Sequence, residues 1–85
     1  MIFIALNKFK QKPTKESAAK VNQLMASAGL KPIGMYVTLG RYDSVVIFEA
    51  PNEKAAIKAG LAVSEIIETE TLVAIPREEL VKLLD

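Results

Sequence analysis

Hydrophobic and polar positions follow two different periods along the chain, and the change of period separates the predicted strands from the predicted helices. Residues 1–9 are apolar on both alternating sets of positions, which is typical of a central strand. After Pro13 the apolar residues recur at helical spacing, with Thr14 as the expected N-cap and Gly29 as the expected end of the helix. The apolar positions of this helix are Ala18, Val21, Leu24, Met25 and Ala28.

The middle of the chain predicts a β-hairpin. Residues 33–39 form one strand rich in β-branched and aromatic residues, and a second strand ends at Ala50. The turn between them is expected over residues 40–43, where a glycine and an aspartate favour a change of direction.

The remaining part of the chain predicts a helix, a strand and a short terminal helix. Pro51 and Asn52 open the helix, whose small residues allow it to pack closely against a sheet. Residues 67–75 form the fourth strand, which Pro76 ends. The short helix has an apolar face that must dock on another surface, formed by Leu80, Val81, Leu83 and Leu84.

This order of elements predicts a ferredoxin-like βαββαβ fold of the α+β class, in a single domain over residues 1–85. Right-handed crossovers place the two long helices on one face of a four-stranded antiparallel sheet. The short C-terminal helix follows the last strand.

The alternation along the hairpin predicts which side chains share a face of the sheet. If Met35 lies opposite Phe48, one face is almost wholly apolar and belongs under the helices: Ile33, Met35, Val37, Leu39, Val46, Phe48 and Ala50. The opposite, open face is expected to collect Gly34, Tyr36, Thr38, Val45, Ile47 and Glu49, joined from the first strand by Phe3, Ala5, Asn7 and Phe9. This face is too apolar for water, so we expect a second copy to cover it in a dimeric α+β barrel.

Polar residues on the expected open face are candidates for a small-molecule site. Asn7, Tyr36, Thr38 and Glu49 are polar groups among apolar ones, the usual composition of a ligand pocket. An inward-pointing Glu49 can serve as a general base. Alternatively, Glu49 forms an ion pair with a lysine or arginine of the second copy, or lies in water at the rim.

The turn adds three further candidates. Asp43 is expected to accept backbone N–H bonds in the turn, and Tyr42 is expected to cover an edge of the sheet. In the functional alternative, Tyr42 binds a ligand as a hydrogen-bond donor at the mouth of the cleft and Arg41 contacts an anion.

The amino-acid composition of the chain excludes several kinds of chemistry and favours an oligomer. The chain is 51% hydrophobic, a high load for one small domain, which favours an oligomer. Cysteine and histidine are absent, so disulfides, thiolate chemistry and the commonest general base and metal ligand are excluded. We expect no cofactor and no metal, and we interpret Glu65, Glu68 and Glu70 as solvated. The apolar residues 1–6 are too short to span a membrane and lack a secretory leader, so we expect a cytoplasmic protein without a membrane partner.

The net charge of +1 gives no reason to expect nucleic-acid binding. Up to residue 31, however, six lysines stand against the single acid Glu16. The ordinary interpretation is a solvated basic loop. The alternative is an anion site near Lys8, Lys10 and Lys12.

The chain resembles the GYD domain family in the stretch G-M-Y-V-T-L-G-R-Y-D-S-V-V-I-F-E-A-P and again in T-E-T-L-V-A-I-P-R-E-E. The glycine, tyrosine and aspartate that name the family stand here at Gly40, Tyr42 and Asp43. The resemblance covers essentially the whole chain and implies a ferredoxin-like dimeric α+β barrel of uncharacterised function. The hairpin is also similar to the effector-binding domain of the leucine-responsive and asparagine-type transcription regulators, whose oligomer interfaces bind amino acids. Cofactor-free monooxygenases share the dimeric barrel, but the histidine that many of them place in the cleft is missing here.

Three functions follow from these observations. We favour a non-enzymatic, homo-oligomeric module that binds a small ligand, or regulates through it, in the cleft between paired sheets. The second is a cofactor-independent enzyme, monooxygenase-like or isomerase-like, that acts on a small organic molecule, for instance an anionic one. Glu49 would be its base and Tyr36 its hydrogen-bond donor. The third is a purely structural oligomer with a dry interface.

Overall fold

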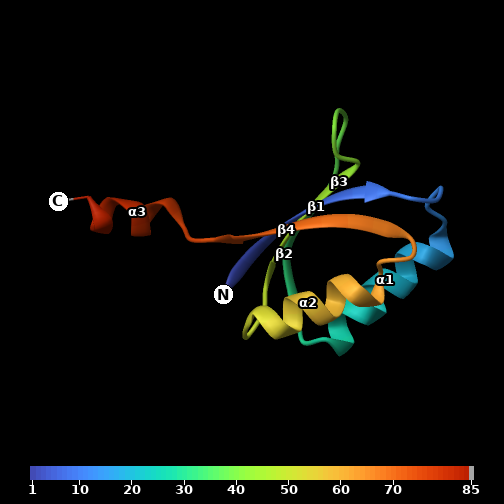
Figure 1. The fold of residues 1–85 in the computed structure, drawn as a ribbon, viewed down its shortest axis with the longest axis horizontal. Helices are drawn as coiled ribbons and strands as arrows, with labels where there is room; N and C mark the ends of the chain where they lie inside the picture. The colour runs from blue at the N-terminus through green and yellow to red at the C-terminus, as the bar shows by residue number, and fades with distance from the viewer. Residues whose placement is uncertain (85) are drawn as a thin grey trace.

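A computed structural model describes residues 1–84, and its elements follow the predicted order (Figure 1). The elements are β1 (Ile2–Phe9), α1 (Lys15–Ser27), β2 (Lys31–Val37), β3 (Ser44–Glu49), α2 (Glu53–Ala62), β4 (Ile67–Ala74) and α3 (Arg77–Leu83). The sheet is antiparallel throughout with strand order β2-β3-β1-β4, and α1 and α2 lie on one face of it (Figure 1). The predicted ferredoxin-like α+β fold is therefore confirmed.

Side-chain caps fix where the two long helices begin. At α1, the N–H of Ser17 donates to Oγ1 of Thr14 at 3.0 Å, and the N–H of Thr14 donates to Oγ of Ser17 at 2.8 Å. At α2, the N–H of Ala55 donates to Oδ1 of Asn52 at 3.0 Å. These bonds satisfy N–H groups that have no partner inside the helix, so both predicted starts are confirmed.

The core lies between the sheet and the two long helices. Phe3 of β1 and Phe48 of β3 stack with ring centroids 5.4 Å apart. The buried apolar side chains around this stack are Phe3, Ala5, Met25, Leu30, Phe48, Ala50 and Ala56. Several of these residues are small, so the core of one chain is thin.

The hairpin differs from the predicted one in register. Met35 lies opposite Val46, two residues away from the predicted partner, and a β-bulge leaves Ile33 out of the ladder. The first strand ends at Val37, so Leu39 is fully exposed in a loop over residues 38–43 instead of lying under the helices. Because a shift of two residues preserves the side-chain alternation, Met35 still shares the helix-covered face with Val46.

The prediction for the faces of the first strand was wrong. Phe3 pairs with Phe48 and Ala5 pairs with Val46, and these residues point toward the helices. Both alternating sets of this strand are apolar, so its own pattern does not decide which set is covered. Which set of side chains faces the helices depends on how the strand pairs with β3, and the sequence alone does not predict this pairing. The residues wrongly placed on the open face are Phe3, Ala5, Asn7 and Phe9.

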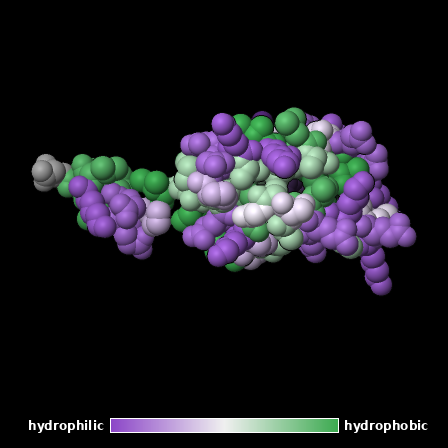
Figure 2. Space-filling model, turned by 90° about the horizontal axis from the view of Figure 1, so that it is seen from below, coloured by the Kyte–Doolittle hydropathy of each residue, from purple (hydrophilic) through white to green (hydrophobic). Residues whose placement is uncertain are grey.

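After Ala74 the chain leaves the body of the molecule and ends in α3, which extends away from the sheet (Figure 1). Seen from below, α3 has hydrophobic residues along one side and hydrophilic residues along the other (Figure 2). No helix within residues 1–84 is both long enough and apolar enough to cross a bilayer.

Candidate functional site

The face of the sheet that the helices leave uncovered is apolar in the middle and charged at its margins. Its central side chains come from all four strands through the observed register. The open face, as we call it from here on, consists of Ile2, Ile4, Leu6, Lys8, Gly34, Tyr36, Val45, Ile47, Glu49, Glu68, Glu70, Leu72 and Ala74. Leu72 on the edge strand is 43% exposed. Such a contiguous apolar surface is typical of an interaction or ligand site.

Asn7 does not belong to this face. It is 6% exposed, lies on the helix-covered side of β1, and its Nδ2 donates to Oγ of Ser44 at 3.1 Å. The hydrogen bond explains why a polar side chain is tolerated there. Asn7 therefore lies on the other face of the sheet from Glu49, although Asn7 and Tyr36 both line a cavity of about 350 Å³ beside α1.

Tyr36 and Glu49 share the open face but lie at different ends of it. Tyr36 is opposite Val45, whereas Glu49 is four residues further along β3 and opposite Lys31. At about 3.4 Å per residue, their backbones are roughly 13 Å apart in one chain. The ring of Tyr36 lies over Gly34, where an added Cβ would come within 2.9 Å of the ring. Both side chains are exposed in the single chain.

The loop over residues 38–43 is fastened to β1 through Asp43. The N–H of Asp43 donates to the carbonyl of Asn7 at 2.7 Å, and its Oδ2 accepts from the N–H of Phe9 at 2.8 Å. Asp43 thus accepts a backbone N–H as expected, but the N–H belongs to β1 and not to the turn. Thr38 closes the loop, since its N–H donates to the carbonyl of Asp43 and its Oγ1 donates to the carbonyl of Tyr42. The hydroxyl of Thr38 is therefore occupied within the loop.

Tyr42 reaches across the sheet to the edge strand. Its hydroxyl donates to Oε2 of Glu70 at 2.8 Å, and the guanidinium of Arg41 lies 5.7 Å from the centre of its ring, within cation–π range. A cavity of about 200 Å³ opens beside this pair on the open face. The charged and phenolic groups that line it, here called the polar cluster, are Lys8, Arg41, Tyr42, Glu68 and Glu70.

The hydrogen bond with Glu70 raises the pKa of Tyr42 above its ordinary value of 10.0, because losing the phenolic proton would place two negative charges together. Partial burial raises this pKa further, whereas the positive charge of Arg41 opposes the shift. At neutral pH, Tyr42 is therefore a protonated hydrogen-bond donor and not a base.

The three lysines of the predicted anion site point to different places. Lys8 lines the cavity of the polar cluster, whereas Nζ of Lys10 donates to the carbonyl of Ser64 at 2.7 Å. Lys12 lines a separate cavity of about 350 Å³ beside α1. This second cavity is also lined by the candidate residues Asn7 and Tyr36, so Lys8 and Lys12 lie near different candidates.

Glu70, which the sequence predicts to be solvated, is exposed but also accepts the hydrogen bond from Tyr42. The alternation along β4 places it on the same face as Leu72, but its contact with Tyr42 depends on where the loop folds, which no local pattern indicates. Among residues 1–84, no group of three or more acidic side chains is arranged to hold a metal ion. The cluster instead offers hydrogen-bond donors and charges of both signs beside an apolar surface.

Comparison with known proteins shows to which family the chain belongs. A search of curated proteins found no match to this chain. A family model of the GYD domain matches residues 5–84, which include the loop residues Gly40, Tyr42 and Asp43. Since this match spans essentially the whole sequence, the chain belongs to the GYD domain family.

Proposed function

We propose that the protein is a homo-oligomeric module that binds a small organic molecule between the open face of one copy and that of a second copy. The observation that carries this proposal is the polar cluster beside the apolar centre of the open face. Small-molecule sites combine apolar walls with a few placed polar groups, and this surface has both.

The chemistry of the face indicates the class of ligand. Ile4, Ile47 and Leu72 offer an apolar floor. The polar cluster at its margin offers the cations Arg41 and Lys8 beside the carboxylates Glu68 and Glu70. A ligand with an apolar body and one polar or anionic end fits this arrangement. Packing a second open face on the first would remove the apolar floor from water and enclose such a ligand.

The test is native mass spectrometry of the protein purified from its own source, beside the denatured chain. We expect an oligomer that carries additional mass. Leu72→Lys is expected to lower the oligomer fraction at least about tenfold, because a lysine would be buried in an apolar interface. Arg41→Ala is expected to lose the additional mass and keep the oligomer.

Ala19→Lys is the matched control, because it adds the same charge on an exposed position of α1 away from the open face. It should keep both the oligomer and the additional mass. An oligomer without additional mass would favour the purely structural alternative. A monomer at micromolar concentration would contradict the proposed interface.

One observation favours an enzyme as the second candidate. The phenol of Tyr42 and the carboxylate of Glu70 form a hydrogen-bonded pair beside a cavity, an arrangement suited to proton transfer. In this case, Glu70→Gln and Tyr42→Phe would abolish turnover of the bound molecule and leave its binding intact. If these variants change only binding or assembly, the module remains the better proposal.

A further inference from the structure

In the part of the chain that the structure describes, no element packs closely enough on the C-terminal arm, defined here as residues 75–84, to explain its helix. Every residue of α3 is exposed, and within residues 1–84 no other element packs extensively against it. A helix of seven residues is too short to persist in water by itself, because helix nucleation is unfavourable. The arm therefore needs a surface that accepts its apolar side.

The apolar side of the arm is continuous. Leu80, Leu83 and Leu84 are spaced three and four residues apart, so they project from the same side of the helix. Figure 2 shows this hydrophobic side opposite a hydrophilic one. Ile75 extends the apolar surface toward β4 and is exposed as well.

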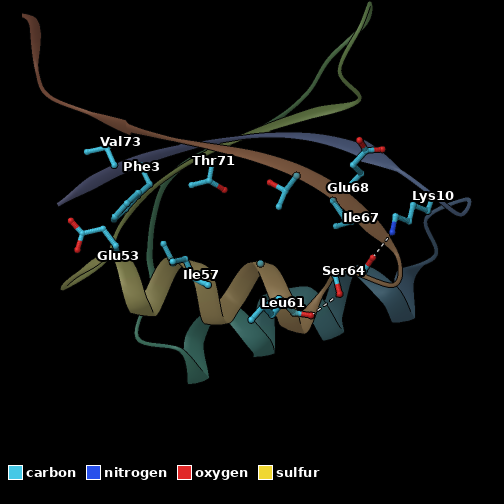
Figure 3. A pocket seen from close by; sticks show the side chains of 13 residues that line it. Phe3, Lys10, Glu53, Ile57, Leu61, Ser64, Ile67, Glu68, Thr71 and Val73 are labelled. Atoms are coloured by element: carbon cyan, nitrogen blue, oxygen red, sulfur yellow. Dashed lines mark hydrogen bonds between the residues drawn. The ribbon is translucent and has the colours of Figure 1, made fainter.

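A groove that could accept such a helix lies between α2 and β4 (Figure 3). Its volume is about 550 Å³. Ile57 and Leu61 of α2 are 61% and 70% exposed, and Val73 of β4 is 60% exposed. Phe3 lies deeper on the sheet side of the groove (Figure 3). The groove thus has large apolar side chains that a single chain leaves in water, beside the polar residues Ser64, Thr69 and Thr71.

The arm of the same chain does not enter this groove. The backbone at Pro76 is extended, with φ −58° and ψ 147°, and the arm continues away from the body of the molecule (Figure 1). To reach its own groove, the chain would have to reverse within the few residues between β4 and α3. A second copy needs no such reversal.

Charges at the two ends of the groove can pair with charges of the arm. Lys10, which is bonded to Ser64, lies with Glu68 at the end where α2 stops, and Glu53 lies at the start of α2 (Figure 3). On the arm, Glu78 and Glu79 stand in the first turn of α3 and Lys82 stands in the last turn. If α3 lies antiparallel to α2, Lys82 meets Glu53 at one end, and Glu78 and Glu79 lie at the end that holds Lys10.

From these observations we propose that the arm of one copy docks in the groove between α2 and β4 of a second copy. Since every copy has both an arm and a groove, the exchange is reciprocal in a twofold dimer. The inference goes beyond the proposed ligand site, because the groove lies on the helix-covered side of the sheet at the β4 edge. The two proposals can therefore fail separately.

The absence of cysteine from the chain permits a direct test. A Val81→Cys chain is mixed with an isotope-labelled Ile57→Cys chain under mild oxidation, and disulfide-linked species are identified by intact mass. In the control, a labelled Lys20→Cys chain replaces the Ile57→Cys chain. We expect the yield of the mixed dimer to be at least about tenfold higher with Ile57→Cys than in this control, because docking raises the effective concentration of the two thiols. Lys20 is an exposed position of α1 and does not line the groove.

Two further measurements decide between the possible occupants of the groove. Adding Leu61→Glu to the Ile57→Cys chain should return the mixed dimer to the yield of the Lys20→Cys control, because a carboxylate would be buried under the arm. A chain carrying both Val81→Cys and Ile57→Cys should form cross-linked dimers. A monomer with an internal disulfide would show docking within one chain and overturn the proposal, as would a mixed dimer no more abundant than in the control. Neither result would bear on the open-face ligand site.

Discussion

At the scale of single residues, the three residues that name the family each have a structural role in the loop over residues 38–43. Gly40 has a φ of +105°, a conformation that residues with a side chain rarely adopt. Tyr42 bonds Glu70 on the edge strand, and Asp43 bonds the backbone of Phe9 on β1. The motif thus holds one loop against two strands, and it places Arg41 and Tyr42 at the polar cluster.

Asp43 offers a direct test of this role. Asp43→Ala removes the acceptor of the Phe9 N–H, a hydrogen bond to a charged group, and should lower the free energy of unfolding by about 1.5–3 kcal/mol. Asp43→Asn keeps an acceptor oxygen and should lose less. Urea unfolding at fixed protein concentration measures both, with Glu65→Ala as the control at an exposed acid. Equal stability of Asp43→Ala and the control would show that this bond does not hold the loop.

Tyr42 gives a prediction for pH dependence. Its pKa in the folded protein is raised above 10.0, chiefly by the hydrogen bond with Glu70. The stabilising contribution of this bond is therefore complete below pH 10 and is lost as the pH rises through the folded pKa. The chain has two tyrosines, so Tyr36→Phe leaves Tyr42 as the sole chromophore for a phenolate titration at 295 nm. In this background, Glu70→Gln should shift the transition to lower pH.

Two phenolate transitions test whether Glu70 raises the pKa of Tyr42. If the phenolate transition of the Tyr36→Phe protein is the same with and without Glu70→Gln, then the carboxylate does not perturb the phenol. Glu68→Gln serves as the control, because this carboxylate lines the same cavity but does not bond Tyr42. It should change the transition less than Glu70→Gln does.

At the scale of elements, the sequence predicts correctly those features that depend on a local pattern of residues. The caps at Thr14 and Asn52 and the positive φ of Gly29 stand at the expected ends of helices, because each depends on a few neighbouring residues. The order of strands and helices follows from the alternation of periods. These local features explain why the fold was predicted correctly.

The errors lie where an element depends on its partner. β1 is apolar on both sets of positions, so which set faces the helices was decided by its pairing with β3. The hairpin register shifted by two residues because the loop is longer than expected and is held by Asp43 on β1. For the site, Tyr36 and Glu49 were placed correctly on the open face, whereas Asn7 was not. The contact between Tyr42 and Glu70 joins residues 28 positions apart and had no local signal.

At the scale of the whole molecule, one chain buries few large side chains and leaves many in water. Phe3 and Phe48 are the aromatic residues of a core completed largely by alanines, while Leu72, Val73 and much of α3 are exposed. Domains of this length bury only about 60–65% of the surface of their unfolded chain, so their stability is marginal. If the chain assembles as proposed, burial of the exposed apolar surfaces on its two sides would supply part of its stability.

The melting temperature should therefore depend on protein concentration. Because dimers dissociate on unfolding, a tenfold increase in concentration is expected to raise the melting temperature by a few degrees, on the order of 4 °C for chains of this size. Leu72→Lys should lower the melting temperature and weaken this dependence, because it would disrupt the proposed open-face contact. Ala19→Lys, at an exposed position of α1, should preserve both. Differential scanning calorimetry from about 10 µM to 1 mM covers a hundredfold range. If the melting temperature of the unmodified protein is constant over this range, the single chain is stable with its apolar surfaces in water. This result would contradict an assembly that is coupled to folding.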